Sequence, residues 1–179
     1  MKTIVPLGRA AAAWAGGFYL HHFALVFGLS LIPTLQRFAV VRWDTPTAVS
    51  ITSEVLVALV RVLLVVLAVR LMILETGLPG RVAWARLKAG IDAHRVAFWG
   101  QWVLLVAAFA GFDLVPNVLI ATVVPESARD LVTAWVVAAK NPTIIAFTML
   151  WMIGIARTLI IGPDPARGDQ TTSTGGSMR

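Results

Sequence analysis

Three ionisable side chains lie near the middle of long apolar stretches, where each needs a polar partner. Arg61 lies about halfway along the apolar stretch 51–74, and His21 and His22 lie within the stretch 11–31. An arginine at the centre of a bilayer costs ~2.5 to 3.5 kcal/mol even on the mildest insertion scale, so Arg61 must face protein, water or another subunit. Because their estimated depths are similar, the sequence predicts a midplane polar layer of His21, His22 and Arg61.

A second polar layer is predicted nearer the outer surface. Glu54 precedes Arg61 by two helical turns and shares its helix face, while Arg37 and Asp113 come from other stretches. The opposite charges predict an outer ion-pair network of Arg37, Glu54 and Asp113. For Arg61 itself, the expected partner is Glu54 or one of the two histidines.

The two polar layers leave two functions open. Ionisable residues inside membranes often form a path, here for a proton, an ion or a lipid headgroup. The same residues can instead pair with one another to fix helix register, or contact another subunit. A single small bundle without a pair of broken helices at its midplane favours this structural role.

Residues for catalysis or for cofactor binding are scarce. The chain has no cysteine, which excludes disulfides, thiolate metal sites and cysteine nucleophiles. It also lacks the G-x-S-x-G, H-E-x-x-H and P-loop motifs. His94 lies at a helix boundary, ~15 Å in depth from the other two histidines, which argues against a haem held by two of them. The sequence predicts no enzyme, no metal and no cofactor.

The elements that must position these side chains are membrane helices. Of the 179 residues, 58% are hydrophobic and only 13% are charged, too few to cover a water-soluble core. Four stretches approach the ~20 apolar residues that cross a bilayer, and without strand-like alternation they read as helices. The prediction is an all-α, polytopic four-helix bundle over residues 1–162, with spans at about 11–31, 51–74, 96–112 and 143–161. Residues 127–140 are expected to form a separate short outer helix before Pro142, and 163–179 a flexible cytoplasmic tail.

The basic residues predict the orientation of the bundle. With the N-terminus inside, the inner segments hold eight lysines and arginines and the outer ones four, which places both termini in the cytoplasm. The net charge of +6 is dispersed and forms no basic run, so no nucleic-acid partner is expected. Twelve arginines against three lysines, with abundant alanine and valine, favour a bacterial plasma membrane as the location.

The loop 77–95 is predicted to be an amphipathic helix at the cytoplasmic surface. Its basic side chains could bind anionic lipid headgroups, or could serve only as the positive-inside signal. Basic residues at the inner ends of the second and fourth spans could bind lipid in the same way. The headgroup candidates are Arg70, Arg81, Arg86, Lys88, Arg95 and Arg157.

The chain also contains a candidate internal duplication. A shift of 83 positions aligns Gly17 with Gly100, Gly28 with Gly111, and Pro33 with Pro116. A true repeat would give two tandem, parallel helical hairpins with kinks near the two prolines. The alternative is that bacterial membrane helices often share glycine and proline at such positions.

The stretch from Gly17 to Pro33, GFYLHHFALVFGLSLIP, resembles the opening of small bacterial multi-pass membrane proteins. These include the membrane regions attached to some glycerophosphoryl diester phosphodiesterases. Since this sequence has no soluble phosphodiesterase domain, the resemblance implies a membrane architecture and no catalytic residue. The expected function is a non-catalytic component of a larger membrane assembly or a homo-oligomer, with lipids and other membrane subunits as partners. The alternative is a small transporter or channel for an ion, a proton or a lipid.

Overall fold

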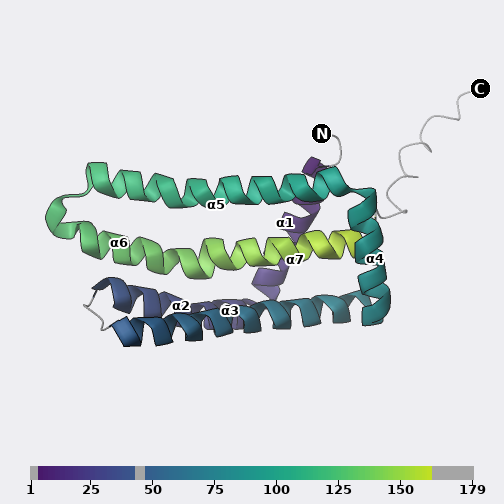
Figure 1. Cartoon of the computed structure of the whole chain (residues 1–179), viewed down its shortest axis with the longest axis horizontal. Helices are drawn as coiled ribbons and strands as arrows, with labels where there is room; N and C mark the ends of the chain where they lie inside the picture. Colours follow the sequence, from purple (N-terminus) through teal and green to yellow (C-terminus); the bar gives the residue numbers. More distant parts are fainter. Residues whose placement is uncertain (1–3, 43–46, 163–179) are drawn as a thin grey trace, which may run out of the picture.

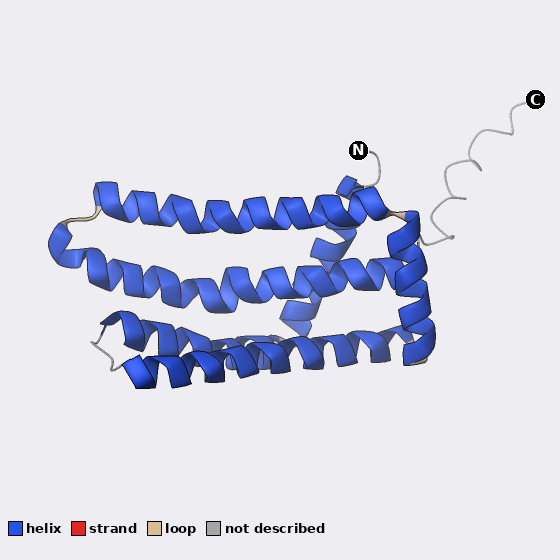
Figure 2. Cartoon of the chain, viewed as in Figure 1, coloured by secondary structure: helices blue, strands red, loops and turns tan. Residues whose placement is uncertain are grey.

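The chain folds into a bundle of helices, which the computed structural model describes over residues 4–42 and 47–162. In chain order the elements are α1 (Ile4–His21), α2 (Phe23–Arg42), α3 (Thr47–Thr76), α4 (Gly80–Ala93), α5 (Arg95–Val123), α6 (Glu126–Lys140), a π-helical turn (Asn141–Ile145) and α7 (Ala146–Ile161). Among these residues Figure 2 shows helices joined by short connections and no strand. The predicted all-α class is confirmed.

Four helical stretches are long and apolar enough to cross a membrane. They run along the long axis of the molecule in Figure 1, and their exposed side chains are largely apolar. This confirms the predicted membrane class, while the kind of membrane and the orientation stay predictions. The stretches are Phe23–Val40, Ile51–Thr76, Arg95–Val123 and Glu126–Ile161.

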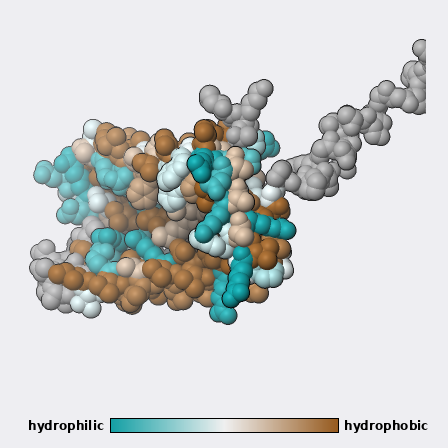
Figure 3. Space-filling model, turned by 45° about the vertical axis from the view of Figure 1, so that its right-hand side comes forward, coloured by the Kyte–Doolittle hydropathy of each residue, from teal (hydrophilic) through white to brown (hydrophobic). Residues whose placement is uncertain are grey.

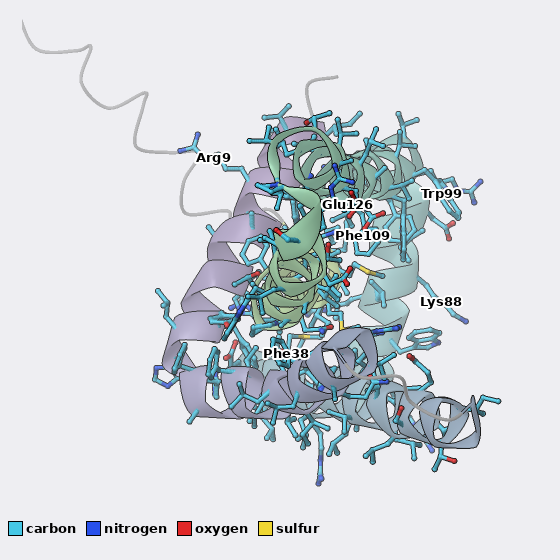
Figure 4. All side chains as sticks on the ribbon, turned by 90° about the vertical axis from the view of Figure 1, so that its left-hand side faces the viewer. Arg9, Phe38, Lys88, Trp99, Phe109 and Glu126 are labelled. Atoms are coloured by element: carbon cyan, nitrogen blue, oxygen red, sulfur yellow. The ribbon has the colours of Figure 1, made fainter. Side chains whose placement is uncertain are left out.

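The expected first span, residues 11–31, is divided at His22 and is therefore corrected. α1 ends at His21, and in both Figure 1 and Figure 4 it runs across the long helices instead of along them. It packs chiefly against α7, and its buried side includes Ala11 and Ala15. A Cβ atom on Gly154 of α7 would lie 2.6 Å from the Ala11 carbonyl oxygen, so the two backbones meet closely. The residues after His22 form a candidate span, whereas α1 is not apolar enough to count as one, and the single window 11–31 averaged over this difference.

The fourth candidate span begins earlier than expected, because α6, the π-helical turn and α7 form one continuous rod. Proline has no backbone N–H and clashes with the preceding turn, so Pro142 interrupts the regular α-helical hydrogen bonds. The wider π-helical turn absorbs this interruption without ending the helix. The expected separate helix 127–140 is thus the first part of the fourth span.

Pro33 and Pro116 lie inside α2 and α5, and both helices continue beyond them. The kinks expected at these prolines stay predictions. The tandem repeat also stays a prediction: the first unit is broken at His22, whereas the aligned Leu105 lies inside the unbroken α5.

α4 lies across one end of the bundle (Figure 1), where it contacts α7. Gly77, with a φ of +65°, makes the turn after α3, a backbone conformation that glycine adopts without steric cost. α4 buries Ala83 and exposes Trp84. Figure 3 shows a hydrophilic band along this helix and an apolar surface beside it, the pattern of a helix at a membrane interface. The expected tail, 163–179, lies outside the described residues.

Candidate functional site

Arg61 of α3 is a partly buried cation inside the bundle. Its Nη2 donates a hydrogen bond to Oδ1 of Asn141 at 3.0 Å, and Nδ2 of Asn141 donates to the Pro33 carbonyl oxygen at 3.2 Å. Asn141 is only 3% exposed and belongs to the π-helical turn. This relay joins α3, the π-helical turn and α2. The sequence predicted Glu54 or a histidine as the partner of Arg61, whereas in the structure the partner is Asn141.

The π-helical turn is held from its other side by α1. The Tyr19 hydroxyl donates a hydrogen bond to the Pro142 carbonyl oxygen at 2.7 Å. Two consecutive residues of the turn, Asn141 and Pro142, thus bind side chains from different helices. Local departures from α-helical geometry often mark functional sites.

The outer polar residues form two separate ion pairs. Arg37 Nη1 lies 2.9 Å from Glu54 Oε1, which links α2 to α3. Asp113 of α5 pairs instead with Lys140 of α6, with 2.9 Å between Oδ1 and Nζ. Each of these carboxylates therefore has a cation as its partner, and neither hydrogen-bonds to Arg61.

A cavity of about 260 Å³ lies among these groups. Phe109 and Phe112 of α5 line it, and Figure 4 shows Phe109 between α5 and α6. We call it the polar cavity, and its polar lining residues are Arg37, Arg61, Asp113, Lys140 and Asn141.

His21 and His22 lie away from the polar cavity, at the end of α1. The His22 ring stacks on Phe18 with 4.3 Å between ring centroids, and its Nδ1 is 3.3 Å from the Phe18 carbonyl oxygen. His21 is exposed and meets His22 edge to face. The expected layer of His21, His22 and Arg61 is not assembled, because α1 turns across the bundle. Among the described residues, no group of three or more histidines and carboxylates is placed to hold a metal ion.

The six headgroup candidates differ in exposure. Arg157 is turned into the bundle: its guanidinium lies 5.7 Å from the Trp14 ring, and its Nε is 3.7 Å from Glu75 Oε2. Trp14 Nε1 donates to the same Glu75 oxygen at 3.1 Å. The other five candidates are exposed: Arg70, Arg81, Arg86, Lys88 and Arg95. Two of them also have a partner within the chain. Arg95 forms an ion pair with Asp92 at 2.7 Å, and the Lys88 ammonium lies 5.4 Å from the centre of the Trp84 ring. Lipid binding by all six stays a prediction.

Lys140 and Asn141 were not predicted as site residues from the sequence. Lys140 was expected in a short outer helix that ends before Pro142, and Asn141 was given no role. One signal could have placed them inside a span: nine residues from Leu131 to Ala139 precede them and contain only one hydroxyl and no charge. At a rise of 1.5 Å per residue, α6 places Lys140 ~21 Å along the helix axis from Glu126.

No protein-family model, curated protein or solved structure matches the chain. The resemblance to the membrane regions of glycerophosphoryl diester phosphodiesterases accordingly stays a prediction.

Proposed function

We propose that the chain is a non-catalytic membrane protein that binds an anionic group in the polar cavity. The observation that carries this proposal is the state of Arg61, a cation within a candidate span whose hydrogen-bond partner is a neutral amide. Its Nε is also buried with no hydrogen-bond partner. A charge held inside a membrane protein without a counter-charge is costly and usually functional.

The balance of charge supports an anion as the ligand. Glu54 is paired with Arg37, and Asp113 with Lys140, so these two pairs are neutral. With Arg37 neutralised by Glu54, which lies outside the described lining, Arg61 is the one lining cation without a carboxylate partner. An anionic ligand would neutralise the charge of Arg61.

The composition of the polar cavity supports a binding role over catalysis. Its described polar lining consists of two arginines, a lysine, an asparagine and one aspartate. The lysine is held in an ion pair, and the lining has no serine, threonine or cysteine that a base could activate. Such a site can bind and orient an anion.

The proposal predicts stabilisation by inorganic phosphate that depends on Arg61. Protein in phosphatidylcholine nanodiscs is unfolded by heat with phosphate, or with chloride at equal ionic strength. A ligand at ten times its Kd stabilises the folded state by ~1.4 kcal/mol, so phosphate should raise the Tm. Arg61→Gln should abolish this rise, and Arg61→Lys should retain part of it because the charge stays.

The matched control is Arg70→Gln, on the same helix at an exposed position. This variant should respond to phosphate like the wild type. Equal responses to phosphate and chloride in the wild type would contradict the proposal, as would a full phosphate response in Arg61→Gln.

A second candidate function, as a homo-oligomeric membrane component, is favoured by the exposure of α5. Only 11% of the most apolar window of this helix is buried, against 39% for the span Glu126–Ile161. Its exposed face carries the neighbouring small residues Ala107 and Gly111, at a spacing that allows two membrane helices to approach closely. The same face on a second copy of the chain would cover it.

Disulfide trapping tests this second candidate, since the chain has no native cysteine. Val103→Cys, one turn from Ala107 on the same face of α5 and 71% exposed, should form a disulfide-linked dimer in native membranes under mild oxidation. Leu59→Cys, 62% exposed on α3, is the control and should give several-fold less dimer. Equal dimer yields at the two positions would exclude α5 as the contact surface.

A further inference from the structure

A second, larger cavity adjoins the polar cavity on the other side of two aromatic rings. Its volume is about 590 Å³, and α1, α5, the π-helical turn and α7 surround it. Phe109, Phe112 and Ile144 line both cavities, so the two spaces are neighbours along α5. We call the second space the chain cavity.

The hydroxyl donors that line the chain cavity are already used. Thr143 donates to the Ala139 carbonyl oxygen at 2.6 Å, and Thr148 donates to the Ile144 carbonyl oxygen at 2.7 Å. The Tyr19 hydroxyl is bound to the π-helical turn. The remaining donor, Nε1 of Trp151, is itself buried, so it is not offered to a ligand at the cavity surface. The part of the lining that a ligand can contact is therefore apolar.

We propose that the ligand is an anionic amphiphile, with a phosphate-like headgroup beside Arg61 and one long hydrocarbon chain in the chain cavity. This proposal rests on the proposed function, because it takes the anionic group of that ligand as its starting point. The excess positive charge in one cavity and the apolar lining of the next match the two ends of such a molecule. A volume of about 590 Å³ lies within the range of sites that bind small organic ligands.

The adjoining cavities also explain why the ligand would bind from the membrane. α5 forms a wall of both spaces and exposes most of its other residues, including Val106 and Leu114. Phe109, 50% exposed, and Phe112, 52% exposed, lie at the boundary between the two spaces. A hydrocarbon chain that reaches this boundary from lipid leaves one apolar environment for another.

A comparison of n-butyl phosphate with n-dodecyl phosphate tests the role of the chain. In phosphatidylcholine nanodiscs, the apparent Kd of each is obtained from its effect on the Tm. Each additional methylene that moves from water into an apolar site strengthens binding about fourfold, so dodecyl phosphate should bind far more tightly. Because dodecyl phosphate also partitions into lipid, variants are compared in identical nanodiscs.

Filling the chain cavity separates protein binding from partitioning. Gly16 lines the chain cavity, and a Cβ added there meets nothing within 4 Å, so Gly16→Phe has room to enter the space. This variant should weaken dodecyl phosphate binding at least tenfold and leave the response to inorganic phosphate unchanged. Gly17→Phe is the matched control: a Cβ at Gly17 also meets nothing, but Gly17 does not line the cavity.

The outcomes distinguish this inference from the proposed function. Loss of the inorganic phosphate response in the wild type contradicts both. A normal phosphate response, with Gly16→Phe and Gly17→Phe binding dodecyl phosphate equally, overturns the amphiphile alone. If Gly16→Phe does not fold, Ala108→Phe fills the same cavity from α5. Its dodecyl phosphate binding is then compared with that of Gly17→Phe, with the same two outcomes.

Discussion

Asn141→Leu should lower the free energy of unfolding by about 2 kcal/mol. Interhelical hydrogen bonds in membranes are usually worth only ~0.6 kcal/mol, but this substitution leaves the Arg61 guanidinium without its partner inside the bundle. The Pro33 carbonyl oxygen also loses a donor. Reversible unfolding of the purified protein in mixed micelles measures the change.

The double variant Arg61→Leu/Asn141→Leu should recover most of that loss. Removing one partner of a buried polar pair leaves an uncompensated group, whereas two apolar side chains can replace the pair with little change in stability. Asn117→Leu, at an exposed position on α5, is the matched control and should stay within about 0.5 kcal/mol of the wild type. A double variant that is less stable than Asn141→Leu would mean that Arg61 is held by other interactions.

Gly154→Ala should destabilise the protein by about 2 kcal/mol, although alanine is the better helix former. The added Cβ would lie 2.6 Å from the Ala11 carbonyl oxygen and 3.1 Å from Cε3 of Trp14, so α1 would have to move away from α7. Overpacking of this kind costs ~1 to 3 kcal/mol. Thermal unfolding should show a lower Tm.

The control for Gly154→Ala is Gly28→Ala in α2, where the added Cβ meets nothing within 4 Å. With no clash, the helix propensity of alanine should stabilise this variant by up to ~1 kcal/mol. The two substitutions are chemically identical, and their opposite signs would locate the effect at the crossing of α1 and α7. A stabilising Gly154→Ala would show that α1 and α7 are further apart at Ala11 than the 2.6 Å from the added Cβ implies.

The extent of the spans was only partly predictable. Ile51–Thr76 is close to the predicted 51–74, because an uninterrupted apolar stretch fixes both its helical state and its length. Residues 11–31 also lack a charge, yet the chain changes direction at His22. Before this change α1 packs closely on α7, where Ala11 meets Gly154 more than a hundred positions away in the sequence, and hydropathy carries no information about such contacts.

The residues of the candidate site were also only partly predictable from the sequence. The sequence identified Arg61 as a group in need of a partner, since burial of a charge is a property of its own stretch. It did not identify Asn141, because Pro142 suggested a helix end at the position where the structure has a π-helical turn. It also expected Asp113 near Arg37, whereas the structure pairs Asp113 with Lys140.

The sequence by itself determined that this protein is helical and built for a membrane. Apolar stretches of bilayer length, with every backbone group in need of an internal hydrogen bond, leave the helix as the structure that satisfies them. Only the tertiary structure decided which charges meet, where α1 turns, and that two cavities of opposite character adjoin along α5. The physical reason is that these features depend on the rotation and offset of one helix against another. Small residues such as Gly154 set that geometry by allowing close approach between segments far apart in the chain.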